Sequence, residues 1–410
     1  MNATMLTVYV STNGCVEGQL SSTYVEQFFR KNKLAVTRDP EQADLLVFYA
    51  CGLTEQKEKD SLSIIIRLQE RMKPTARLVV WGCLPRINPK SLRTIYDGPI
   101  LGPTDTSFFE KILEKTTVSL DSVLEARAAN MLIATETSES NECYCTDKLA
   151  NAIIFAKQLM GRLRARADKA TNFFIRVATG CTGRCTYCSE RCVFGRIQSR
   201  PIEKIMSEFK WGLQQGYNRF SLIATDLGAY GKDIGLTLPD LLAKMIKTNY
   251  KKNYKLILNQ VEPSYLKEMF YDLEEILASG KVEALNCPVQ SGSNRILELM
   301  GRPYTADEWK EYMVRINRKF PNIQLSTHFM VGFPTETDED FRATLKLLDY
   351  PLFLYNIYLF KFSKRPGVYA SRIPGQIPEE TKESRCRKLL QKHARKYALN
   401  APIMYVRRLF

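Results

Sequence analysis

Three closely spaced cysteines are the residues of this chain best suited to chemistry. Cys181, Cys185 and Cys188 have the spacing C-x-x-x-C-x-x-C within the stretch GCTGRCTYCSERC. Thiolate is the soft ligand that iron–sulfur clusters and zinc both prefer. A cubane cluster needs four ligands, so three cysteines would leave one iron open to a small molecule. The alternative is a structural zinc knuckle with Cys192 as fourth ligand, at a spacing that fits zinc poorly.

The segment before these cysteines predicts where they lie. Residues 172–180 (NFFIRVATG) are aromatic and β-branched and end in glycine, which predicts a buried strand. The thiols then lie on a loop at the C-terminal end of a strand. This is where α/β barrels place their chemistry, and it favours the cluster over zinc.

A second set of three cysteines occupies equivalent positions near the N-terminus. Cys15, Cys51 and Cys83 each come at or just after a strand-like run, at 6–12, 44–51 and 77–83. Helical patterns separate these runs, which predicts a mostly parallel sheet whose strands share one carboxyl edge. We expect the three thiols to converge there as one ligand set. The alternative is three ordinary buried cysteines.

The alternation of strands and helices divides the chain into two α/β regions. Residues 1–125 predict a Rossmann- or flavodoxin-like domain, and 126–170 a polar and basic linker that holds the unassigned thiols Cys143 and Cys145. Residues 171–375 predict a partial (β/α)6 barrel, and 376–410 a basic helix and tail. The predicted barrel strands are 173–180, 220–226, 255–261, 283–289, 324–333 and 354–360.

Polar residues follow several predicted barrel strands and would lie on the same rim as the thiols. Asp226, Gln290, Ser291 and Glu336 are the candidates there for holding a small molecule, although each could equally cap a strand or form a turn. Two other residues, Arg302 and Lys364, could meet a substrate anion. For both of these we expect a solvated surface position instead. Cys192 and Cys287 are expected to be plain thiols.

Composition narrows the class of protein. The 410 residues are 45% apolar and 25% charged, as in an ordinary globular protein, and no apolar run approaches a membrane span. Eleven cysteines without an export signal favour metal binding or catalysis over disulfides, and we expect a cytoplasmic protein. The net charge of +15 indicates a polyanionic partner such as RNA, an anionic substrate, or merely a basic surface.

The cysteine loop, with Tyr187 just before its third cysteine, resembles the radical S-adenosylmethionine superfamily. The rest of the chain is similar to one branch of it, the methylthiotransferases, which modify transfer RNA adenosines or a ribosomal-protein aspartate. The similar stretches are TNGC (12–15), ACGLTE (50–55), WGC (81–83), FGRIQSRP (194–201), ATDLGAYGKD (224–233), PVQSGSNRILELMGRPYT (288–305), VGFPTETDEDF (331–341) and FKFSKRPG (360–367).

The resemblance implies two [4Fe–4S] clusters. Cys181, Cys185 and Cys188 would bind the cluster that cleaves S-adenosylmethionine to a 5′-deoxyadenosyl radical, and the N-terminal set would bind an auxiliary cluster that holds the sulfur to be transferred. Tyr187 joins the four rim residues as a candidate for binding S-adenosylmethionine. An electron donor of flavodoxin or ferredoxin type would be needed.

Several positions depart from the family pattern. Ser189 to Cys192 replace a short apolar-proline stretch, so Glu190 and Arg191 indicate an altered target. Gly18 stands where an Asn is common, and His328 replaces the usual Asp before the Gly-Phe-Pro turn. We also expect the C-terminal TRAM barrel to be missing, because the chain stops at Phe410 after a helix.

The sequence therefore predicts a radical enzyme that inserts sulfur or a methylthio group at an unactivated C–H carbon. A tRNA base, a peptide and a small metabolite all remain open as its substrate. One alternative is a radical enzyme that transfers or rearranges sulfur in a natural-product pathway without methyl transfer. Another is a non-catalytic RNA-binding protein stabilised by metal, which the two cysteine sets make the weaker prediction.

Overall fold

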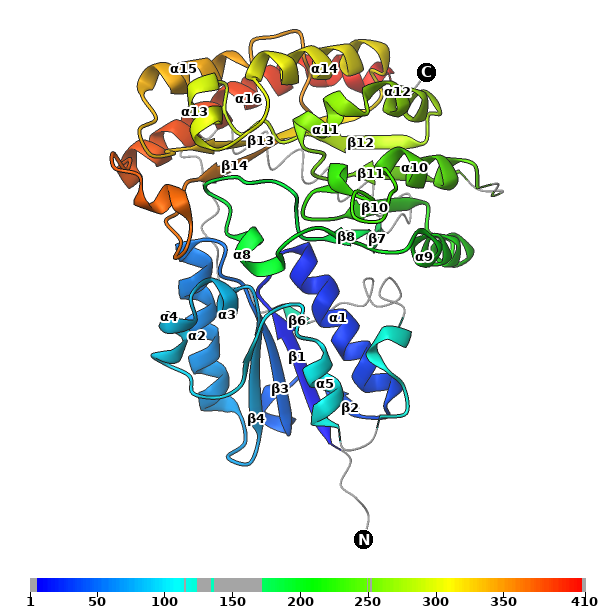
Figure 1. The fold of residues 1–410 in the computed structure, drawn as a ribbon, viewed down its shortest axis with the longest axis vertical. Helices are drawn as coiled ribbons and strands as arrows, with labels where there is room; N and C mark the ends of the chain where they lie inside the picture. Colours follow the sequence, from blue (N-terminus) through cyan, green and yellow to red (C-terminus); the bar gives the residue numbers. More distant parts are fainter. Residues whose placement is uncertain are drawn as a thin grey trace.

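Two parallel β-sheets with their helices form this computed structural model, and Figure 1 shows one above the other. The structure describes residues 6–113, 116–123, 134–135, 172–248, 250 and 253–407. The predicted α/β class is confirmed, with a separate N-terminal sheet and an open six-stranded second sheet. The predicted domain boundaries remain predictions.

The first sheet has the strand order β2-β1-β3-β4-β5, with β6 paired to β1, and every pairing is parallel. β3 lies at its centre and is buried at every residue, as its apolar run LLVFYA predicts. Its strands are β1 (Thr7–Thr12), β2 (Ala35–Thr37), β3 (Leu45–Ala50), β4 (Arg77–Gly82), β5 (Ile100–Leu101) and β6 (Ala134–Thr135). The short strands β2, β5 and β6 were not predicted.

Helices begin where the strands of the first sheet end. Cys15 directly precedes α1, and Cys83 directly precedes α3. The Thr54 hydroxyl accepts from the amide of Lys57 and so caps α2. The helices are α1 (Val16–Lys31), α2 (Glu55–Arg71), α3 (Leu84–Ile87), α4 (Pro89–Arg93) and α5 (Ser107–Ile112), with short 3₁₀ turns at Pro40–Gln42 and Leu120–Ser122.

The second sheet has the order β14-β13-β12-β11-β10-β7 and is parallel throughout. Its strands are β7 (Asn172–Arg176), β10 (Arg219–Ile223), β11 (Lys255–Leu258), β12 (Val282–Asn286), β13 (Gln324–Val331) and β14 (Asn356–Lys361). Its helices are α8 (Glu190–Phe194), α9 (Ile202–Gln214), α10 (Leu238–Ile246), α11 (Pro263–Glu268), α12 (Phe270–Ala278), α13 (Asn294–Leu299), α14 (Ala306–Lys319), α15 (Asp338–Lys346) and α16 (Glu379–Arg407).

Alternate residues of these strands face two different environments. On β13, Leu325, Phe329 and Val331 are buried in the main apolar core with the helices, whereas Ser326 and His328 lie on the other side. We call the side away from this core the inner face. None of the helices in the described ranges is long and apolar enough to span a membrane.

The prediction of one strand over 173–180 was wrong. β7 ends at Arg176, and Ala178–Thr179 forms a separate strand, β8, paired antiparallel with β9 (Gln198–Ser199). Gly180 then takes a φ of +74°, with the carbonyl oxygen of Arg196 only 2.1 Å from where a Cβ would stand. The cysteine loop therefore starts where the chain at Gly180 packs closely against the backbone of Arg196, and not directly at the end of a strand of the second sheet.

Asp340 joins two helices of the second region. Its carboxylate accepts hydrogen bonds from the amide and hydroxyl of Thr337 at 2.9 and 2.8 Å, from the Ser293 hydroxyl at 2.6 Å, and from Arg295. Burial alone would raise the pKa of Asp340, but these hydrogen bonds outweigh it and hold that pKa below its usual range.

We expect Asp340→Asn to lower the free energy of unfolding by about 2 kcal/mol at pH 7, because the amide cannot accept all four bonds. Because the pKa of Asp340 is lower in the folded protein, its carboxylate stabilises the folded state fully at pH values above the unfolded-state pKa of about 3.9. This stabilisation is lost as the pH falls through the folded-state pKa. The difference in free energy of unfolding between wild type and variant, measured by urea denaturation, should therefore be constant above about pH 5 and shrink below about pH 4. The control is the exposed Asp97→Asn, and an equal effect of both changes would contradict the argument.

Candidate functional site

The cysteine loop is held firmly at the carboxyl end of the second sheet. The Thr186 amide donates to the Met300 carbonyl at 2.9 Å, and its hydroxyl donates to the Leu299 carbonyl at 2.7 Å. A Cβ built on Gly183 would lie 3.2 Å from Cys181 Sγ and 3.6 Å from Cys185 Sγ. Glycine at this position therefore lets two of the three thiols approach the same space.

Asp226 lies beside this loop, after β10. The Cys181 thiol donates to its Oδ2 across 3.8 Å, and the Gly228 amide donates to its Oδ1 across 3.1 Å. Burial, followed by the negative charge of Glu262, raises the pKa of Asp226 to about 7. Burial and then the charge of Asp226 raise the pKa of Cys181 to about 12. The structure thus brings a predicted rim carboxylate next to a predicted cluster ligand.

The expectation that Arg302 occupies the solvated surface was wrong. Its side chain is 11% exposed, with Nη1 3.5 Å from Glu262 Oε1 and Nη2 donating to the Tyr187 hydroxyl. The guanidinium also lies over the rings of Tyr187 and Tyr304, at 5.5 and 5.9 Å from their centroids. A buried arginine needs such partners, so Arg302 ties Tyr187 to the carboxylates of the rim. Lys364 is exposed, as expected.

The remaining rim candidates differ in what their side chains contact. Gln290 has a φ of +71°, and its buried Oε1 has no hydrogen-bond partner among the described residues. The Ser291 hydroxyl accepts from the Ser293 amide at 3.1 Å, within the turn that starts α13. Glu336 Oε2 accepts from the Gly332 amide at 2.6 Å and from Arg385 at 2.7 Å. Among the described residues, Gln290 Oε1 and Glu336 Oε1 are therefore the acceptors of these three side chains that lack a partner, and a cofactor role for all three remains a prediction.

The N-terminal cysteines follow three strands of the first sheet that lie side by side. β1, β3 and β4 are neighbours, and Cys15, Cys51 and Cys83 come after their carboxyl ends. Cys51 and Cys83 are buried, which raises the pKa of both thiols, and the charges of Cys51 and Cys15 raise that of Cys83 further. The Tyr49 hydroxyl lies 3.4 Å from Cys83 Sγ. The fold therefore gathers three thiols that are distant in sequence.

Helix α8 links the two thiol sets. It starts two residues after Cys188, and its Val193 and Phe194 pack into the core of the first sheet together with Cys83. Figure 1 shows α8 between the two sheets. Burial is the main cause of the raised thiol pKa values, and the charge of Glu190 is a further cause at Cys188 and at each N-terminal cysteine. Glu190 therefore lies between the sets.

Each thiol set has the donor chemistry of a cubane cluster. Within the described ranges, no three His, Cys, Asp or Glu side chains are grouped as ligands of one metal ion. A cubane binds each thiolate at a different iron, so its ligands stand further apart than those of a single ion. The three thiols of the cysteine loop, two of them beside Gly183, and the three at neighbouring strand ends have the ligand type that such a group needs. Cys143 and Cys145 lie outside the described residues.

Two ion pairs between the regions escaped the sequence analysis. Arg365, after β14, pairs with Glu58 of α2, and the side chains are only 3% and 11% exposed. Arg176 of β7 lies 2.7 Å from Glu17 of α1. No sequence pattern signals pairs whose partners are 307 and 159 residues apart. These contacts join helices of the first region to the second region.

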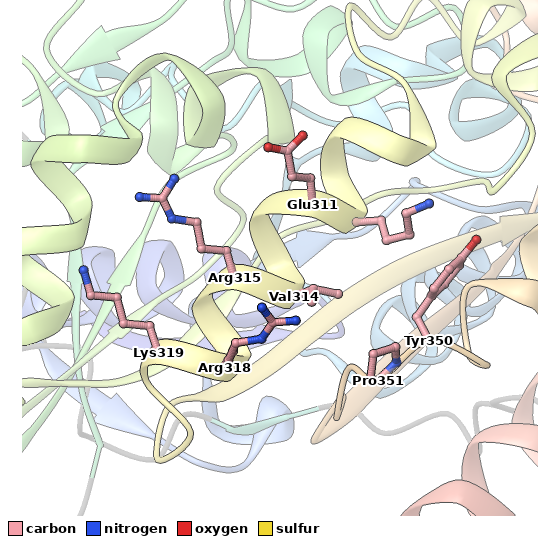
Figure 2. A pocket seen from close by; sticks show the side chains of 8 residues that line it. Glu311, Val314, Arg315, Arg318, Lys319, Tyr350 and Pro351 are labelled. Atoms are coloured by element: carbon pink, nitrogen blue, oxygen red, sulfur yellow. The ribbon is translucent and has the colours of Figure 1, made fainter.

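The surface has two hollows, one beside the thiols of the cysteine loop and one away from them. One, of about 390 Å³, lies between the cysteine loop and residues 367–369. The other, of about 770 Å³, lies on the outer surface of α14, where Arg315, Arg318 and Lys319 project near Pro351 (Figure 2). Arg318, Lys319 and Pro351 precede the amino ends of β13 and β14. The second hollow is therefore basic but lies away from the carboxyl edge that carries the thiols.

Two family models match this chain. Residues 175–348 match the radical SAM superfamily, and residues 7–99 match the uncharacterized protein family UPF0004. Each match covers most of the strands of one of the two sheets.

Curated relatives match along most of the chain. A probable threonylcarbamoyladenosine tRNA methylthiotransferase of Pyrococcus abyssi is 28% identical over 92% of this chain and 82% of its own length. The ribosomal protein uS12 methylthiotransferase RimO of Protochlamydia amoebophila is 29% identical over 92% and 74%. The structure of TsrM from Kitasatospora setae, a radical S-adenosylmethionine methyltransferase, has a TM-score of 0.61 at 14% identity and covers 90% of this chain and 77% of that one.

We expect Arg365→Met to lower the free energy of unfolding by about 3 kcal/mol, because it leaves Glu58 buried without its cation. The double variant Arg365→Met/Glu58→Leu should recover much of this loss, since it removes the stranded charge. Both are measured by chemical denaturation, with the exposed Arg318→Met as the matched control. A double variant no more stable than the single one would contradict this role.

Proposed function

We propose that this chain, which belongs to the radical S-adenosylmethionine methylthiotransferase family, inserts sulfur or a methylthio group at an unactivated C–H carbon. It is a transferase by family. The observation that carries the proposal is the pairing of two three-thiol sets, each at the carboxyl edge of its own sheet and with Glu190 between them.

The two thiol sets would take different roles. Cys181, Cys185 and Cys188 would hold a [4Fe–4S] cluster with one iron free for S-adenosylmethionine, and Cys15, Cys51 and Cys83 would hold an auxiliary one. When bound, these groups supply the one-electron cleavage that yields a 5′-deoxyadenosyl radical and the sulfur to be transferred. The protein itself must bind and orient these groups and the substrate, and it must exclude water from the site.

Several rim residues and Tyr187 would orient S-adenosylmethionine. The Asp226 carboxylate contacts the Cys181 thiol and would accept hydrogen bonds from the amino group of the ligand. Gln290 Oε1, buried and unpartnered in the described part of the chain, would accept from a ribose hydroxyl. Arg302 holds Tyr187 in position through its hydroxyl, and Glu336 is held in turn by Arg385.

Transfer RNA is the partner that the charge of the chain supports best. The net charge of +15 would favour association with phosphates, and the relative from Pyrococcus abyssi is named for a tRNA nucleoside. A peptide or a small metabolite is the outcome to be tested against it.

Anaerobically reconstituted protein should contain about eight iron atoms, as two cubane clusters require. Triple alanine variants of either cysteine set should retain about four. The variant that keeps Cys181, Cys185 and Cys188 should still form 5′-deoxyadenosine from S-adenosylmethionine and a reductant. Cys192→Ala is the matched control and should keep all eight. Zinc in place of iron, or no 5′-deoxyadenosine from wild type, would refute the proposal.

Binding to bulk tRNA should weaken steeply with salt, because each neutralised phosphate releases a counterion. Gel shifts from about 50 to 200 mM salt should give a linear fall of log K against log salt. Polyglutamate, a polyanion without bases, serves as competitor control. No binding at the lowest salt would exclude tRNA and leave a peptide or metabolite.

A further inference from the structure

The turn that follows α13 packs directly against the cysteine loop. The Thr186 amide of the loop donates to the Met300 carbonyl at 2.9 Å. Gly301 has a φ of +70°, and a Cβ built on it would lie only 3.0 Å from the carbonyl oxygen of Arg184. Because the two backbones approach each other at both places, the next residue, Arg302, is held beside the loop.

The guanidinium of Arg302 reaches the loop between two of its cysteines. Its Nη2 donates to the hydroxyl of Tyr187, which directly precedes Cys188 and is two residues after Cys185. Its Nη1 lies 3.5 Å from Oε1 of Glu262, and both side chains of this pair are 11% exposed. The structure therefore places a buried cation in contact with the cysteine loop and pairs it with a buried anion.

Little water surrounds this cation. Its Cζ lies over the rings of Tyr187 and Tyr304, at 5.5 and 5.9 Å from their centroids. Tyr304 is 6% exposed, and its hydroxyl donates to the carbonyls of Pro288 and Val289, which fixes the ring. The Nε of Arg302 is buried and has no hydrogen-bond partner within the described ranges. Arginine keeps its charge in proteins, and a charge acts more strongly where water does not screen it.

The electrostatics of the thiols agree with this geometry. Burial is the main cause that raises the pKa of Cys185, and the charge of Arg302 is the next cause and opposes it. The charge of Glu262 raises the same pKa. At Cys181, burial and the charge of Asp226 raise the pKa, and the charge of Arg302 again opposes them. Arg302 and Glu262 therefore act on the same thiol with opposite signs.

We propose that Arg302 tunes the reduction potential of the cluster held by the cysteine loop, and that its charge makes this cluster easier to reduce. The inference rests on the proposed function and names a residue that controls the same site. Reduction moves one electron from an external reductant to the cluster, and no bond forms or breaks. The reduced cluster carries one more negative charge, so a fixed cation beside its ligands stabilises it. Arg302 is thus a positioning residue that acts through the loop.

A purely structural role of the pair makes a different prediction. If Arg302 and Glu262 only held the loop in place, removal of either partner would loosen the loop in the same way. If their charges act on the cluster, removal of the cation and removal of the anion must move the potential in opposite directions. The sign of the two shifts therefore distinguishes the two roles.

A redox titration of the reconstituted full chain, followed by electron paramagnetic resonance, tests this. The chain carries Cys15→Ala, Cys51→Ala and Cys83→Ala, so that only the cluster of the cysteine loop is titrated. We expect Arg302→Met to lower the equilibrium constant for one-electron reduction about tenfold, which is a shift of about 59 mV to more negative potential. Glu262→Gln should shift the potential in the positive direction, and Arg302→Lys should stay closest to the parent chain.

Two control variants separate the charge of Arg302 from its other contacts. Arg318→Met removes an exposed arginine of α14 and should leave the potential unchanged, because water screens that charge. Tyr187→Phe removes the hydroxyl that the guanidinium contacts but keeps the cation, so it should shift the potential less than Arg302→Met does.

Shifts of Arg302→Met and Glu262→Gln in the same direction, or equal shifts of Tyr187→Phe and Arg302→Met, would overturn the inference. If Arg302→Met does not retain its iron, Glu262→Gln decides: a positive shift supports the inference, and an unchanged potential overturns it. Formation of 5′-deoxyadenosine by the same samples tests the proposed function separately. Unchanged potentials with 5′-deoxyadenosine formed would refute the tuning alone, and the expected shifts without 5′-deoxyadenosine would refute the proposed function alone.

Discussion

The parallel arrangement of strands is the constraint on which the rest of this structure depends. Strands that run in one direction end at one edge, so residues that follow different strands meet there. The first sheet uses this to gather Cys15, Cys51 and Cys83 after β1, β3 and β4. The second sheet places its cysteine loop and Asp226 at its own carboxyl edge. Helix α8 then runs from that loop into the core of the first sheet, which fixes the two edges relative to each other.

Buried arginine–glutamate pairs connect parts of this arrangement at three points. Arg302 pairs with Glu262 beside the cysteine loop, and Arg385 of α16 pairs with Glu336 after β13. Arg365 pairs with Glu58 across the two regions. Such pairs add little net stability when intact. Removing one partner leaves the other charge buried and unpaired, so the pairs restrict which packing is allowed. Arg302 and Arg385 thereby hold Glu262 and Glu336, which follow β11 and β13, in fixed orientations.

Most of the secondary structure could be predicted from the sequence, because strands and helices leave local periodicities. The core strands lie within three residues of their predicted starts and ends except where non-local contacts intervene. The run 173–180 has the composition of one strand, yet its last part pairs with β9 instead of continuing β7. Arg302 was placed on the surface because nothing nearby in sequence announces Glu262 and Tyr187 as its partners. Tyr358 and Phe360 belong to a predicted strand. The local sequence does not show which face of that strand is covered by helices, so their exposure could not be predicted.

Cysteine spacing and position after strand-like runs predict the two thiol sets from the sequence, since ligand type and strand ends are local properties. The surroundings of the thiols depend instead on the tertiary structure. The placement of Glu190 between the sets, the burial of Arg302, and the exposed rings beside His328 all depend on which strands are neighbours and which faces meet helices. Those are contacts between residues distant in the chain, and their energy comes from burial that no single segment can provide.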